Sequence, residues 1–174
     1  MALTKDYKEY FKEVEDSIFS TLQSLPVPNG TVYACSFWLF YCDYFKILAP
    51  CFAYNTIQNI IDSETKWSPP EWEVDVENNM FESLHPIYEK ISAFMENKVE
   101  DEWAELIEYQ WKFYCDLSQN INNLLKTKEF PLTHWSVSED FVFGILEERE
   151  SEEIFCYLVE NSIGKNKAIT LKII

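Results

Sequence analysis

Residues 31–54 constrain the fold most strongly, because large apolar side chains occupy both faces of this segment when it is drawn as a β-strand. Successive side chains of a strand point to opposite faces, which places Tyr33 and Phe37 on one face and Ala34 and Trp38 on the other. A strand that is apolar on both faces is buried on both. The sequence therefore predicts a sheet with helices or loops packed against each of its faces.

The same segment predicts a hairpin, with a turn at Cys42-Asp43 and a second strand over residues 44–52. Apolar, β-branched and aromatic residues predict further strands at 140–147 and 169–174. Because the two strands of a hairpin run antiparallel, we expect a mostly antiparallel sheet.

Helices are predicted where apolar residues recur at spacings of three and four. The segments with this character are residues 4–25, 57–61, 83–95, 100–125 and 152–162. The last of them also has strand-forming residues at its centre, but helix signals at both of its ends favour a helix. No linker, repeat or low-complexity tract divides the chain. The expected fold is therefore a single α+β domain over residues 1–174, a sheet with helices packed against it.

The formal net charge is −16, and the acids gather in two blocks. Residues 62–108 hold fourteen acids and three lysines, a net of −11, and residues 139–160 hold eight acids and Arg149, a net of −7. Nucleic acids and anionic membranes need a basic surface, so both are excluded as partners. If the two blocks meet in space, they form one negative surface that steers basic proteins to it. Acidity that serves only solubility is the alternative.

The sequence carries no mark of export or of membrane insertion. No apolar run reaches the length of about 18 residues that a spanning helix needs, and the N-terminus has no basic region followed by an apolar core. The five cysteines form no Cys-x-x-Cys pair, and their odd number favours reduced thiols, mostly buried. The expected location is the cytoplasm.

Residues that carry catalysis are scarce. His85 and His134 lie in different segments without ligand spacing, and three glycines leave no phosphate-binding loop. We therefore expect no catalytic residues, no cofactor and no metal site. Asp101, Glu105 and Glu108 share one helix face, where paired carboxylates could support acid–base chemistry or hold a cation. A solvated acidic face is the alternative.

The run Trp67-Ser68-Pro69-Pro70-Glu71-Trp72, with Asn55-Thr56 before it, resembles a signature of an uncharacterised bacterial family of unknown function. Members of that family are similar to small proteins found beside polymorphic toxins. The resemblance implies an immunity role, and it brings no catalytic residues with it.

These observations predict a non-enzymatic, cytoplasmic immunity protein that neutralises a cognate toxin by occluding it. The toxin is expected to be basic and nuclease-like. The residues predicted to bind it are Glu71, Trp72, Glu73, Asp75, Glu77, Asp101, Glu102 and Glu105. Tryptophan is favoured both at binding sites and in cores, so the alternative is an enzyme or small-ligand protein with a pocket near Trp67 and Trp72. A subunit of a homo-oligomer is a further alternative.

Overall fold

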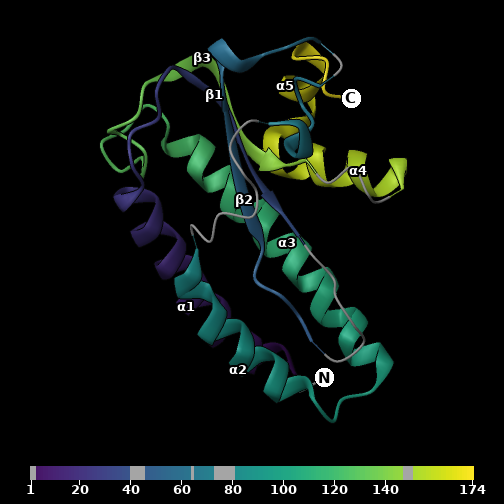
Figure 1. Ribbon diagram of the computed structural model, residues 1–174. Coiled ribbons are helices and arrows are strands. Elements are labelled where there is room, and N and C mark those ends of the chain that lie inside the picture. Colours follow the sequence, from purple (N-terminus) through teal and green to yellow (C-terminus); the bar gives the residue numbers. More distant parts are fainter. Residues whose placement is uncertain (1–2, 40–45, 64, 73–80, 147–150) are drawn as a thin grey trace.

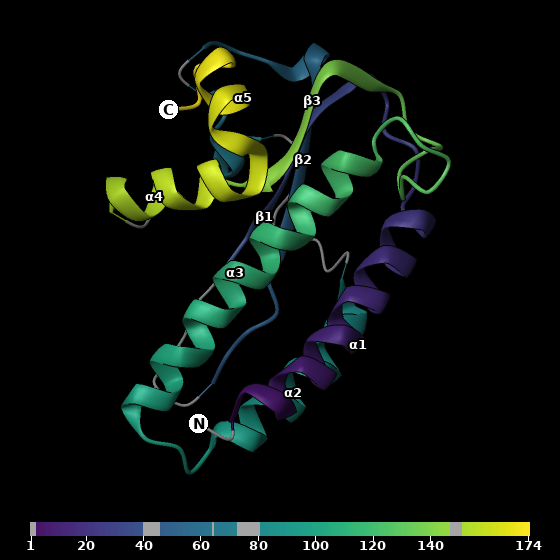
Figure 2. The same ribbon diagram turned by 180° about the vertical axis from the view of Figure 1, so that it is seen from behind.

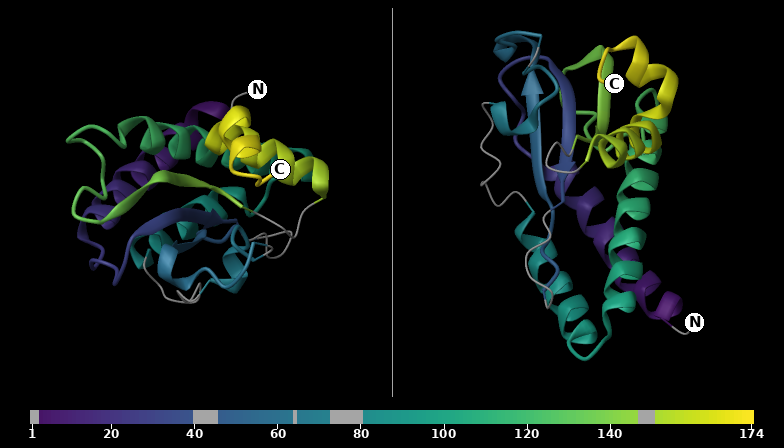
Figure 3. Two further views of the ribbon diagram at one scale, coloured as in Figure 1. Left: turned by 90° about the horizontal axis from the view of Figure 1, so that it is seen from above. Right: turned by 90° about the vertical axis from the view of Figure 1, so that its right-hand side faces the viewer.

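Three amphipathic helices pack against one face of a small sheet, and the C-terminal helices pack beside the last strand (Figure 1). A computed structural model describes residues 3–39, 46–63, 65–72, 81–146 and 151–174, with residues 3–7 described at the backbone only. The α1 and α2 helices and the N-terminal half of α3 extend beyond the strands, toward the end where the N-terminus lies (Figure 3). The predicted α+β class is confirmed.

The helices follow the apolar stripes of the sequence. The α1 helix spans Leu3–Ser24 and buries a stripe that runs from Phe11 to Leu22. The α2 helix spans His85–Met95 and carries a proline in its first turn, where no backbone donor is required. The longest helix, α3, spans Glu100–Leu124, and three acids in its first turn complement the helix dipole. The predicted helix at 100–125 is therefore confirmed.

The sheet is mixed, and the expected mostly antiparallel arrangement is wrong. Its order is β2-β1-β3, with β1 at Val32–Trp38, β2 at Cys51–Thr56 and β3 at Val137–Ile145. The β1 strand pairs antiparallel with β2 and parallel with β3. A parallel neighbour needs a long crossover, and residues 57–136, which contain α2 and α3, provide it.

Two strand positions differ from the prediction. The β2 strand spans Cys51–Thr56 instead of residues 44–52, and it begins after Pro50 because proline lacks the N–H that a paired strand uses. The predicted turn at Cys42-Asp43 lies outside the described residues. The β3 strand begins at Val137, three residues before its predicted start.

The predicted burial of both sheet faces is confirmed. Phe37 belongs to the core under α1, α2 and α3, whereas Ala34 belongs to a second core formed with Trp67, Trp72 and the C-terminal helices. An irregularity between Val32 and Ala34 breaks the alternation. Tyr33 consequently faces the second core with Ala34, and not the first core with Phe37 as strict alternation predicts.

The C-terminal segment is helical from Glu152 to Thr170. The α4 helix spans Glu152–Val159, a π-helical turn covers Glu160–Gly164, and α5 spans Lys165–Thr170. The helix predicted at 152–162 is confirmed, but the strand predicted at 169–174 is wrong. A fourth strand has no place beside β3, because side chains of α3 and the C-terminal segment already bond its outer edge.

Short 3₁₀ turns connect the other elements: Ile57–Asn59, Pro69–Glu71 and Glu82–Leu84. The first of them replaces the short helix predicted at 57–61. Within the described residues, no helix combines the length and the apolar character that crossing a bilayer requires.

A buried tyrosine pair joins α2 to α3 and predicts a loss of stability at alkaline pH. Tyr88 Oη and Tyr114 Oη lie 2.6 Å apart, and burial raises the pKa of both hydroxyls. The unfolded chain releases these protons near pH 10 while the folded chain keeps them, so stability present below about pH 10 is lost as pH rises. We expect the free energy of unfolding to fall by up to about 1.4 kcal/mol per pH unit for each tyrosine.

Urea unfolding at about pH 9 and about pH 11 measures this loss. The Tyr88→Phe/Tyr114→Phe variant removes both hydroxyls from one hydrogen-bonded pair and leaves neither without a partner, so it should fold and lose less stability over the same interval. Equal losses of stability in the variant and the wild type would contradict the assignment of the alkaline loss to this tyrosine pair.

Candidate functional site

The α3 and α4 helices enclose a groove that opens away from the sheet. They touch where Cys115 Sγ lies 3.8 Å from the carbonyl of Leu158, and they diverge from that contact toward the N-terminus of α4 (Figure 2). The space between them is a hollow of about 580 Å³. It is lined by Glu105, Glu108, Tyr109, Trp111, Lys112, Glu153, Ile154 and Tyr157. This volume lies in the range of ligand-binding sites in proteins.

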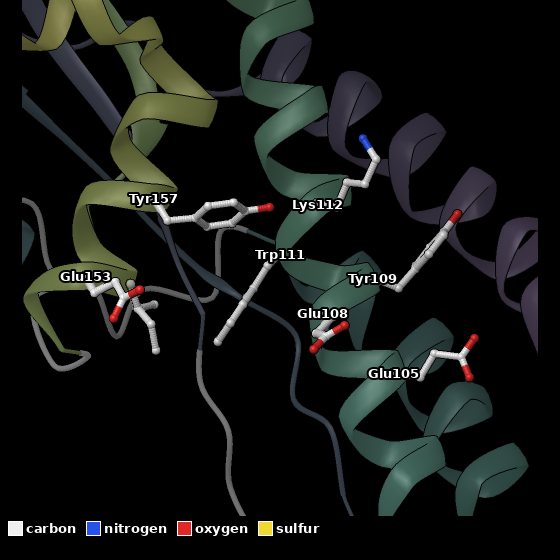
Figure 4. A pocket seen from close by; sticks show the side chains of 8 residues that line it. Glu105, Glu108, Tyr109, Trp111, Lys112, Glu153 and Tyr157 are labelled. Carbon is white, nitrogen blue, oxygen red and sulfur yellow. The ribbon is translucent and has the colours of Figure 1, made fainter.

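Aromatic and aliphatic side chains form the walls of the groove. Trp111 from α3 and Tyr157 from α4 point into the space between the two helices (Figure 4). Tyr157 is 47% exposed, which is a large apolar surface left open to solvent. Trp111 and Ile154 are half-buried and pack against the core under α1, α2 and α3, which restrains their side chains. The groove therefore offers rigid aromatic surface, which protein interfaces favour.

Carboxylates surround the aromatic walls. Glu108 lies on α3 and Glu153 faces it from α4, while Glu105 projects from the outer side of α3 (Figure 4). Lys112 is the basic residue of the lining, and its Nζ lies 2.6 Å from Asp116 Oδ2. The hydrogen bond that Lys112 donates to Asp116 raises the pKa of Lys112, and the carboxylate balances the charge of the lysine. The three glutamates leave the groove negative.

The groove joins the two acidic blocks of the sequence. Glu105 and Glu108 close the block at 62–108, and Glu153 belongs to the block at 139–160. The two blocks are far apart along the chain, and the packing of α4 beside α3 brings their members to one hollow. Three of their carboxylates, two from the first block and one from the second, therefore line the same groove.

The predicted binding residues do not form one cluster. Among those on α3, Glu105 lines the groove and Asp101 is exposed in the first turn, whereas Glu102 caps the helix with Oε2 3.0 Å from the backbone N–H of Val99. Glu71 is exposed in the turn Pro69–Glu71. This turn lies beside the sheet, while α3 begins at the opposite end of the molecule (Figure 1). Glu73, Asp75 and Glu77 lie outside the described residues.

The two tryptophans of the sequence motif belong to the second core. The exposed fractions of Trp67 and Trp72 are 8% and 5%, and both rings pack edge-on against Tyr33. The Lys66 carbonyl accepts hydrogen bonds from Tyr33 Oη at 2.5 Å and from Trp72 Nε1 at 3.1 Å. Asn55 Nδ2 donates to Tyr33 Oη, so both distinctive pieces of the motif meet at this tyrosine. Both tryptophan rings therefore contribute to the packing of the second core.

Two buried cysteines have thiols of low reactivity. Burial raises the pKa of the Cys115 thiol to about 12 and that of Cys35 well above its ordinary value, so both stay protonated near neutral pH. Cys51 and Cys156 are half-buried. In the described ranges, no three His, Cys, Asp or Glu side chains are placed to hold a metal ion.

A second hollow of about 490 Å³ lies where α2 meets the segment before β2. Cys51, His85 and Tyr88 contribute to its lining, together with Lys46 and Glu89. The lysine and the glutamate balance each other, so charge does not select a ligand for this hollow. The groove between α3 and α4 differs because three glutamates line it against one lysine, and Asp116 already balances the charge of that lysine.

A comparison of the chain with protein-family models, with curated proteins and with solved structures found no match. The resemblance of the Trp67 to Trp72 motif to a family of unknown function stays a prediction.

Proposed function

We propose that this protein acts without catalysis by binding a basic partner protein at the groove between α3 and α4. One observation carries the proposal: carboxylates from both acidic blocks of the chain, Glu105 and Glu108 from one and Glu153 from the other, line a single hollow with aromatic walls. A negative surface accelerates the association of a positively charged partner and fixes its orientation. Aromatic side chains at the centre supply the affinity, because tryptophan and tyrosine are enriched among the residues that dominate binding energy.

The most concrete form of this function is an immunity protein in the cytoplasm. A toxin that cleaves nucleic acid must carry a basic surface for the phosphates of its substrate. An acidic protein that covers this surface blocks access of the substrate. The motif at Trp67 to Trp72 supports this role through the family that it resembles, and the groove supports it through its charge.

Reversing the charge of the groove should abolish most of the binding. A tagged wild-type protein is expected to retain a basic protein from a lysate of the source cell at low salt, and less of it at high salt. With that partner purified, Glu108→Lys/Glu153→Lys should weaken the affinity by roughly 30- to 100-fold, because two attractive charges become repulsive. Isothermal titration calorimetry measures the difference.

A matched variant distinguishes an effect of the groove on affinity from an effect of the total charge of the protein. Glu129→Lys/Glu139→Lys changes the net charge equally at exposed positions outside the groove lining, one in the connection between α3 and β3 and one on β3. Its affinity should stay within about threefold of the wild type. An equal loss in both variants would show that only total charge matters, and full affinity in the groove variant would exclude this site.

A further inference from the structure

We infer that the groove binds an arginine side chain of the partner, with the guanidinium against Trp111 and Tyr157 and its N–H groups directed to Glu108 and Glu153. This inference rests on the proposed function and specifies the chemistry that the groove recognises. It depends on four side chains from two helices that enclose one hollow.

The carboxylates of the groove are available to a cation. Within the described part of the chain, neither Glu108 nor Glu153 forms a hydrogen bond or an ion pair, whereas Lys112 is already bound by Asp116. A carboxylate only accepts hydrogen bonds, so an anionic ligand would be repelled and would find no donor on these two residues. The groove therefore selects a positively charged donor.

The aromatic walls favour arginine over lysine. Trp111 and Tyr157 project from facing helices, and the rings present flat apolar surface beside the carboxylates (Figure 4). A guanidinium is planar, sheds its hydration readily and stacks on aromatic faces. It also carries five N–H donors in a fork that matches carboxylates, whereas a lysine ammonium is a strongly hydrated point charge. A site with both elements recognises arginine best.

The test uses three short peptides that differ only in the side chain at two positions, which is the same at both positions of each peptide. The probes are acetyl-Ala-Arg-Ala-Arg-Ala-amide and the same peptide with lysine or with neutral citrulline in place of arginine. Each is titrated into the full chain, and the indole N–H resonance of Trp111, assigned with Trp111→Phe, reports occupancy of the groove by NMR. The arginine peptide should move this resonance and bind at least fivefold (~1 kcal/mol) tighter than the lysine peptide, while citrulline leaves it unmoved.

A conservative variant and a small cation complete the test. Glu153→Gln should weaken the arginine peptide about three- to tenfold, and Glu129→Gln, outside the groove lining, should leave its affinity unchanged. No movement of the Trp111 resonance at millimolar arginine peptide, or equal affinity for lysine, overturns the inference. Tighter binding of spermine than of the arginine peptide overturns it as well, since a polyamine would then be the better occupant.

Failure of this inference is distinct from failure of the proposed function. If Glu108→Lys/Glu153→Lys loses the partner while the peptides show no preference for arginine, the partner binds here through other groups. If the arginine peptide binds the groove but the same variant keeps the partner, the peptide site stands and the proposed partner surface fails.

Discussion

Replacement of Asn122 by leucine is expected to lower the free energy of unfolding by about 2–4 kcal/mol, since two backbone groups of a buried residue lose their partners. Asn122 Oδ1 accepts from the N–H of Phe143 at 2.9 Å, and Nδ2 donates to the carbonyl of Phe143 at 2.7 Å. The same Nδ2 lies 3.2 Å from the carbonyl of Ser162. Phe143 is fully buried, so water does not readily replace the lost hydrogen bonds.

The effect is large because Asn122 closes the outer edge of β3. An edge strand presents unpaired N–H and C=O groups, and proteins cover them to prevent pairing with other chains. Here the amide of Asn122 takes the place of a neighbouring strand, and Ser162 Oγ accepts from the N–H of Ile145 at 3.1 Å further along. Two residues before Phe143 in β3, the carbonyl of Phe141 accepts a hydrogen bond from Lys167 Nζ at 2.7 Å.

Urea unfolding of Asn122→Leu and of Asn123→Leu measures the effect against a matched control. Asn123 is the next residue of the same helix and is exposed, so its replacement should change stability by no more than about 0.5 kcal/mol. Similar losses in the two variants would mean that the bonds to β3 contribute little.

Gly144→Ala is expected to destabilise the fold by about 2 kcal/mol through overpacking. A Cβ atom added to Gly144 would lie 2.6 Å from Cγ1 and 2.7 Å from Cδ1 of Ile163, far inside ordinary contact distance. Ile163 stands in the π-helical turn that packs on β3 and has little room to move, since 7% of it is exposed. The glycine is therefore required for the close approach of this turn to the strand.

A double-mutant cycle identifies the clash. Ile163→Ala removes both atoms that the new methyl group would meet, at a cost of about 2–4 kcal/mol for the cavity. The variant with both substitutions should then be more stable than the sum of the single effects predicts, by at least about 1 kcal/mol. Additive losses would place the strain of Gly144→Ala elsewhere.

The parts of the fold that depend on local pattern were predictable from the sequence. The apolar stripe of α3 predicted the bounds of that helix to within one residue. The apolar residues on both faces of β1 predicted that both faces are buried. The direction of β3 was not predictable, because a long crossover permits either orientation beside β1. The helical end of the chain was also missed, since it depends on how Asn122 and Ser162 occupy the edge of β3.

The candidate site was predicted only in part for the same reason. The sequence identified Glu105 and the two acidic blocks, but the meeting of the blocks depends on the packing of α4 against α3. Trp111 and Tyr157 were missed. A signal for Trp111 was present, because it is a large aromatic residue outside the buried stripe of its helix, and such a position is typical of a binding surface.

Site-specific photo-crosslinking in the source cell tests the central claim most directly. A benzoylphenylalanine in place of Tyr157 puts a reactive aromatic group in the groove, and the same residue in place of the exposed Val27, in the loop after α1, provides the control. We predict that one protein with a net positive charge crosslinks through position 157 and not through position 27. Capture of the partner through position 27 alone, or of acidic proteins through position 157, would contradict binding of a basic partner in the groove.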